Sequence, residues 1–117
     1  MIYRRKRAKA TIALDGTLSG AVPIGGAACA LLMPAAWTAA TITFQAGHEE
    51  AGVITYRDLY DQDGDEVELT VAVDRHVILN PAEFLGVEHL KIRSGTAAAP
   101  VQQVAAREIY VIYREMG

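Results

Sequence analysis

The stretch "VITYRDLYDQDGDEVELTVAV", residues 53–73, consists of two β-like segments on either side of an aspartate-rich turn. At its centre, Asp63-Gly64 is a typical two-residue hairpin pair, because glycine takes a positive φ without strain and aspartate tolerates one. The second segment alternates regularly, with four apolar positions predicted to face inward: Val67, Leu69, Val71 and Val73. The stretch therefore predicts a β-hairpin, and with it a β-rich fold.

The same stretch suggests a calcium loop as the alternative, because Asp61, Asp63 and Asp65 occupy alternate positions around Gly64. An EF-hand loop that begins at Asp61 requires glycine at its sixth position and glutamate at its twelfth. Those positions are Glu66 and Ala72, so the pattern favours the turn. The three aspartates stay a weak candidate for Ca²⁺, and no other metal site is predicted.

Strand-like segments recur along the rest of the chain between turn signals. They are "KATIALD" (9–15), "AACALLM" (27–33), "TITFQ" (41–45), "HVIL" (76–79), "VEHLKIRS" (87–94) and "REIYVIYR" (107–114). Helix signals are limited to "PAAWTAA" (34–40) and "NPAEFLG" (80–86), and residues 95–106 are predicted to form a long loop. The sequence predicts an all-β, jelly-roll-like antiparallel β-sandwich of about eight strands with one or two short helical turns.

The charge is distributed unevenly over the 117 residues. Five of the 11 basic residues lie within residues 1–9, which leaves six basic against 14 acidic residues, or −8, from residue 10 onward. This predicts a basic N-terminal arm (1–9) on a single β-sandwich domain (10–117). The arm either binds nucleic acid or an acidic partner, or is only a solvated terminus. The partner-binding candidates are Tyr3, Arg4, Arg5, Lys6, Arg7 and Lys9.

If the arm is ordered only on assembly, deleting residues 1–9 is expected to leave the melting temperature nearly unchanged. The acidic body has no broad basic face, so no nucleic-acid readout is expected. Residues 16–48 carry no charged side chain, but Pro23, Gly25, Gly26 and Pro34 interrupt the apolar run. We therefore expect no membrane association.

The sequence contains no recognisable catalytic set, so we expect neither enzymatic activity nor a cofactor. Cys29 is the only cysteine and lies in an apolar run, which favours a buried inert thiol. Trp37, Tyr56 and Tyr60, together with Arg57 and Arg93, are candidates for a ligand face. The aromatic residues could equally pack the sandwich, and either arginine could pair across strands.

The segments "MPAAWTAATITFQA", "TYRDLYD" and "LKIRSGTAAAPVQQ" resemble small virion structural proteins of tailed phages, prophages and gene-transfer-agent-like particles. The resemblance covers roughly Gly25 to Arg114. A weaker, fold-level similarity links the order of these segments to discoidin-like, galactose-binding jelly rolls, from which no binding residue is carried over.

The resemblance implies a virion location, with assembly in the bacterial host cytoplasm. The expected function is that of a capsid decoration, cement or head-fibre protein that contacts other virion proteins, such as the major capsid protein or tail components. Such proteins are expected to form homo-oligomers, for example trimers. The alternative is a carbohydrate-binding or host-adhesion module of the tail.

Overall fold

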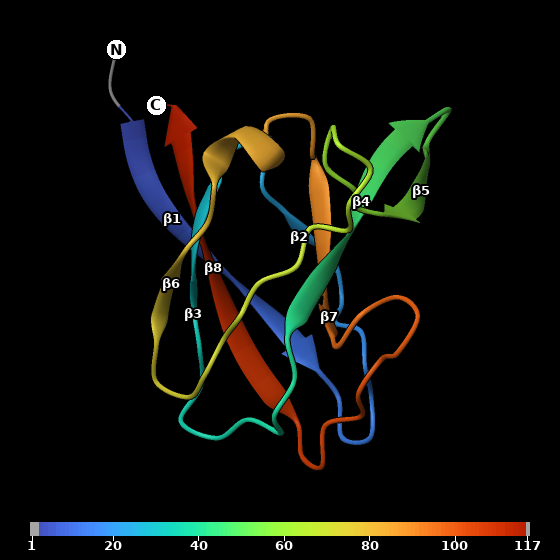
Figure 1. Cartoon of the computed structure of the whole chain (residues 1–117). Helices are drawn as coiled ribbons and strands as arrows, with labels where there is room; N and C mark the ends of the chain where they lie inside the picture. The colour runs from blue at the N-terminus through green and yellow to red at the C-terminus, as the bar shows by residue number, and fades with distance from the viewer. Residues whose placement is uncertain (1–2, 117) are drawn as a thin grey trace.

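The computed structural model describes residues 3–116 as two four-stranded antiparallel sheets packed face to face (Figure 1). One sheet has the order β1-β8-β3-β6 and the other the order β2-β7-β4-β5. The strands are β1 (Tyr3–Ile12), β2 (Val22–Pro23), β3 (Ala28–Leu32), β4 (Ile42–Glu50), β5 (Val53–Asp58), β6 (His76–Ile78), β7 (His89–Ser94) and β8 (Arg107–Met116). The prediction of an all-β sandwich with about eight strands is confirmed.

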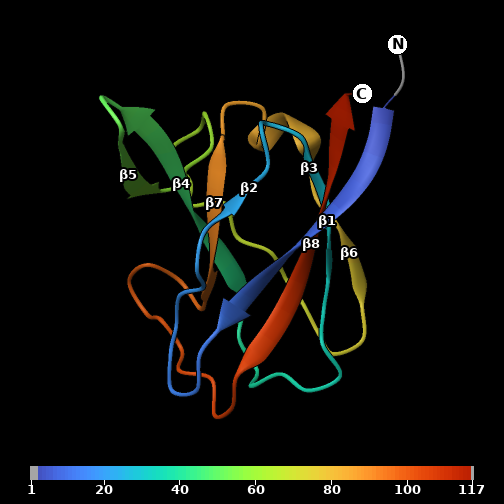
Figure 2. The ribbon, with the colours of Figure 1, turned by 180° about the vertical axis from the view of Figure 1, so that it is seen from behind.

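The strand pairing is that of a jelly roll. Strand β1 pairs with β8, β2 with β7, β3 with β6, and β4 with β5. This is the pattern of one long hairpin, with its tip between β4 and β5, whose paired strands are divided between two sheets. Figure 2 shows the same two sheets from behind. The topology brings both ends of the chain to one sheet, where the outer ends of β1 and β8 lie side by side.

The prediction of an N-terminal arm separate from the sandwich is wrong for the residues that the structure describes. Residues 3–9 belong to β1, which pairs with β8 continuously from Tyr3↔Met116 to Ile12↔Arg107. The basic composition concealed this strand, because Arg4 to Arg7 are exposed and carry no apolar alternation. Their order comes from the ladder with β8. Met1 and Ile2 lie outside the described residues.

The predicted strand at residues 66–73 is not regular. It makes only isolated bridges, Tyr60↔Glu66 and Ile42↔Leu69. The chain here must pass from β5 in one sheet to β6 in the other, so it cannot keep a ladder with either. The inward alternation is nevertheless real for Val67, Leu69 and Val71, which contribute to the core, whereas Val73 is 44% exposed.

The core lies between the sheets and is entirely aliphatic and aromatic at its centre. Ile12, Leu31, Ile109 and Val111 come from one sheet, and Ile42, Phe44, Leu90 and Ile92 from the other; all have no accessible surface. The ring of Phe44 meets that of Phe84 edge-on, with 5.2 Å between the centroids. Phe84 closes one end of the sandwich from the loop between β6 and β7.

Of the two predicted helical turns, one forms. Residues Pro81–Glu83 make a 3-10 turn, and the Asn80 side chain accepts a hydrogen bond from the Ala82 N–H. The other segment, 34–40, is irregular. There Gln103 accepts from the N–H of Thr38 and donates to its carbonyl, which replaces the bonds of a helical turn. Residues 95–106 form the predicted long loop.

Candidate functional site: an uncovered sheet face

The residues predicted to make a ligand face do not come together. Trp37 packs against the core and its Nε1–H donates to the Ala40 carbonyl at 3.1 Å. Tyr56 and Arg57 are neighbours on β5 and therefore point to opposite faces of the strand. Tyr60 is 54% exposed at the start of the aspartate turn. Arg93 is buried, with 7% of its surface accessible.

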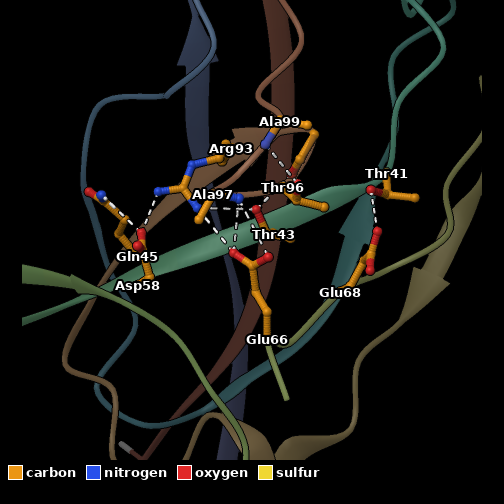
Figure 3. Close-up of polar contacts among 11 residues, drawn as sticks. Thr41, Thr43, Gln45, Asp58, Glu66, Glu68, Arg93, Thr96, Ala97 and Ala99 are labelled. Atoms are coloured by element: carbon orange, nitrogen blue, oxygen red, sulfur yellow. Dashed lines mark hydrogen bonds and ion pairs between the residues drawn. The ribbon is translucent and has the colours of Figure 1, made fainter. Parts of the chain in front are cut away.

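Arg93 is the centre of a polar network on the outside of the β2-β7-β4-β5 sheet (Figure 3). Its guanidinium pairs with the carboxylates of Asp58 and Glu66, the latter at 3.3 Å, and donates to the Thr43 hydroxyl at 3.4 Å. The hydrogen bond from Arg93 holds the pKa of the Asp58 carboxyl below its ordinary value of 3.8, although partial burial opposes the shift. Of the two roles predicted for Arg93, a ligand contact or a cross-strand pair, the pair is therefore the one observed.

This network fixes two loops against the sheet. Glu66 accepts a second hydrogen bond, from the Ala97 N–H at 3.1 Å. Nearby, the Thr41 hydroxyl donates to Glu68 at 2.7 Å. Because the loops on either side of Arg93 are held by its partners, they cover this part of the sheet. The network therefore has a structural role, because its guanidinium and both of its carboxylates are engaged in ion pairs with one another.

The aspartate stretch forms a turn, as predicted, but not the expected two-residue one. The Gly64 N–H donates to the Asp61 carbonyl at 3.1 Å, and Gly64, with φ of +86°, is the residue of the turn in the left-handed region. The Asp61 carboxylate accepts from the N–H groups of Asp63 and Asp65, so it caps its own turn. No group of three or more potential ligands able to hold a metal occurs within residues 3–116.

The opposite face of the molecule is different, because no part of the described chain is layered over the outside of the β1-β8-β3-β6 sheet. We call this surface the outer face. The strand registers arrange its side chains in rows across the strands. One row is Arg7, Ile112, Ala30 and Ile78, and the next is Lys9, Tyr110, Leu32 and His76. The outer face thus has a basic margin along β1 and an apolar centre.

The basic margin is only partly neutralised. On this margin Lys9 pairs with Glu108 at 3.5 Å, and on the opposite face of β1 Lys6 pairs with Glu115 at 3.9 Å; both are exposed pairs that contribute little. The Arg7 guanidinium stacks over the Tyr110 ring at 4.7 Å. Neither Arg4 nor Arg5 has a carboxylate partner within the described part of the chain. The side chain of Tyr3, the remaining predicted partner-binding residue, lies outside the described residues.

A shallow groove of about 330 Å³ crosses the apolar centre of the outer face. Its floor includes Ala30 and Ile112, Ile78 forms one wall with 72% of its surface exposed, and Arg5, Arg114 and His76 lie at the rim. Cys29 also lines the groove and is half-buried, not fully buried as predicted, because a register shift in β3 falls at this residue. An apolar floor with arginine side chains at its rim suits an apolar side chain flanked by carboxylates.

Comparison of the chain with protein families, with curated proteins and with solved structures gives no match. Among residues 3–116, none of the helical structure is long and apolar enough to cross a membrane. The class that can be assigned from the fold and the surface is thus an all-β jelly roll with one loop-covered sheet and one uncovered sheet.

Proposed function

We propose that this chain is a structural protein of a phage or phage-like virion, a capsid decoration, cement or head-fibre component that docks on its neighbours through the outer face. The observation that carries the proposal is the apolar centre of that face. Ile78 is largely exposed there, in one row with the half-buried Ile112 and the buried Ala30. Exposed apolar surface with a polar rim is typical of protein interfaces.

Two further points support this function. The three segments that carry most of the resemblance to virion proteins of tailed phages, residues 33–46, 55–61 and 90–103, lie outside the strands of the outer face, although the resemblance as a whole, roughly Gly25 to Arg114, includes three of those strands. Jelly rolls are also common in viral structural proteins, although the fold by itself does not define a function. A protein present in many copies on a lattice gains avidity from modest individual contacts. A binding role without catalysis fits this surface.

The test compares two substitutions that introduce the same charge at equally exposed apolar positions. Ile78 lies on the outer face and Val104 in the loop 95–106; they are 72% and 69% exposed. We expect Ile78→Glu to abolish attachment to purified particles, measured by co-sedimentation and mass spectrometry, while Val104→Glu attaches like the wild type. If both variants attach normally and remain folded, the outer face is not the docking surface.

A second candidate function is glycan binding in a tail adhesion module. It is favoured by a groove of about 350 Å³ beside the aspartate turn, where the exposed Tyr60 ring lies with Asp61, Asn80 and Glu83. An aromatic ring beside carboxylate and amide groups suits a sugar. A glycan array with and without Ca²⁺ tests it: binding that is lost in Tyr60→Ala supports adhesion, and the absence of any bound glycan argues against it.

A further inference from the structure

The first observation concerns the direction of the backbone groups in β1. The Gly20 N–H donates to the Thr11 carbonyl from the side of β1 that is opposite β8, and the Arg114 N–H donates to Ala27, away from β1. The backbone groups of Thr11 therefore point away from β8. The backbone groups of Arg5 do the same, because Arg5 is the residue opposite Arg114 in the ladder between β1 and β8. In an antiparallel strand the backbone groups alternate in direction. The N–H and C=O groups of Arg5, Arg7 and Lys9 thus point to the open edge of the sheet.

The second observation concerns the charge along that edge. The side chains of these same three residues form the basic margin of the outer face, and Arg4 and Lys6 project from the opposite face of the strand. Strand β1 contains no acidic residue. Within residues 3–116 the backbone hydrogen bond to this edge is the one from Gly20 to Thr11, so the edge from Arg5 to Lys9 combines unpaired backbone groups with the positive side chains of Arg5, Arg7 and Lys9.

The third observation excludes a second copy as the occupant of this edge. If two copies paired antiparallel through β1, arginine and lysine would face arginine and lysine across the new ladder. Like charges directly opposite each other are destabilising, and charged edge strands are a common means by which proteins prevent edge-to-edge association. If the added strand is acidic instead, the charge interaction across the ladder becomes attractive.

We propose that the Arg5–Lys9 edge of β1 binds an extended acidic segment of a partner protein by strand addition, so that the sheet gains a fifth strand. The backbone ladder supplies affinity, and carboxylates opposite Arg5, Arg7 and Lys9 supply the choice of partner. The proposal rests on the proposed docking function and deepens it, because it names the chemistry of the neighbouring protein. The apolar centre of the outer face then contacts the remainder of that neighbour.

The test separates backbone pairing from charge by a matched pair of variants, Arg7→Pro and Arg7→Thr. Both remove the guanidinium and its contact with Tyr110, but only proline removes the N–H that points to the open edge. Proline is tolerated there, because this N–H does not bond to β8. The probe is a blocked peptide of about seven residues that alternates glutamate and threonine, and its control alternates lysine and threonine.

We expect the full-length wild type to bind the acidic peptide and not the basic one, measured by isothermal titration calorimetry. Arg7→Thr should weaken binding modestly, and Arg7→Pro should weaken it about tenfold further, because a ladder hydrogen bond is lost and the ring blocks the added strand. Arg5→Pro and Arg5→Thr provide a second pair if Arg7→Pro melts at a lower temperature than Arg7→Thr.

Equal affinities for the proline and threonine variants would overturn strand addition, because charge alone would then explain binding. Strand addition would also be overturned if a single-stranded DNA oligonucleotide bound as tightly as the acidic peptide and Arg7→Pro did not weaken that binding. The edge would then be a general polyanion site. Particle attachment shows whether the strand-addition proposal alone has failed or the proposed docking function as well. If Arg7→Pro attaches normally while Ile78→Glu does not, the docking function stands and the strand-addition proposal fails.

Discussion

At the scale of single residues, Arg93 has a large expected effect on stability. Replacing it with methionine would leave Asp58 and Glu66 without their cation, and the side chain of Glu66 is only 16% exposed. Breaking a buried pair from one side typically costs about 3 kcal/mol. We expect Arg93→Met to lower the free energy of unfolding by about that amount in urea denaturation.

The exposed Arg57 of β5 provides the control, since Arg57→Met should change stability by less than about 0.5 kcal/mol. A stability of Arg93→Met equal to or above that of the wild type would contradict the structural role. It would mean that the cost of burying the guanidinium exceeds the gain from its two ion pairs.

The pH dependence of stability follows from the lowered pKa of Asp58. The pKa of this carboxyl is lower in the folded than in the unfolded chain, so its ion pair stabilises the fold fully above the ordinary value of 3.8. This contribution is lost as the pH falls through the lowered pKa of the folded state. We expect the wild type to lose more stability between about pH 4 and about pH 2 than Asp58→Asn does. Parallel stability-versus-pH curves for the two proteins would contradict this.

The sequence allowed part of this residue-level picture to be predicted. Alternation in "HLKIRS" places Arg93 on the face of its strand opposite Ile92, and cross-strand pairing was one of the predicted roles. Its burial was not predictable, because Glu66 and Asp58 lie 27 and 35 residues away in sequence. Only the three-dimensional arrangement of the end of β5, which carries Asp58, and of the loop that follows it, which carries Glu66, brings the two carboxylates to Arg93.

At the scale of elements, Gly95 marks the exit of β7 into the long loop. Its φ is +87°, and a Cβ there would lie 2.5 Å from the Ala99 carbonyl oxygen. Gly64 has nearly the same φ, +86°, but nothing within 4 Å of its Cβ position. We expect Gly95→Ala to destabilise the protein by about 3 kcal/mol and Gly64→Ala by about 1 kcal/mol, in urea denaturation. Equal losses would mean that backbone strain alone, without crowding, sets the cost.

The N-terminal strand gives a prediction opposite to that for a free arm. Deleting residues 1–9 removes Ala8, which packs against the core, and the ladder bonds that β1 makes with β8 over this range. We expect the free energy of unfolding to fall by about 2 kcal/mol or more. An unchanged melting temperature on deletion would show that these residues are dispensable for the fold.

Strand prediction succeeded where apolar and polar residues alternate because one face of the strand is buried against the core, as in β4, β7 and β8. It failed where other factors dominate. The charged half of β1 is held by pairing and not by burial, and β2, at two residues, is too short for a period to be visible. Residues 66–73 alternate because they cover the core, yet they cross between sheets. Alternation alone cannot distinguish such a crossing from a strand.

At the scale of the whole molecule, the two sheets have different exteriors. The network around Arg93 holds loops over part of the β2-β7-β4-β5 sheet, whereas the outer face of the β1-β8-β3-β6 sheet stays open with its apolar centre and basic margin. The long-range order of the jelly roll creates this asymmetry, since it places β1 at the edge of the open sheet. Alternation predicted the class of fold, but the outer face depends on registers between strands that are distant in sequence.

The most direct test of the docking function is a cryo-electron microscopy reconstruction of particles produced from the genome that encodes this chain. We predict density for a jelly roll on the particle, with the outer face covered by a neighbouring protein and Ile78 inside the contact. Absence of the chain from the particle would contradict the account. So would a jelly roll whose outer face is turned to solvent while the loop-covered sheet makes the contacts.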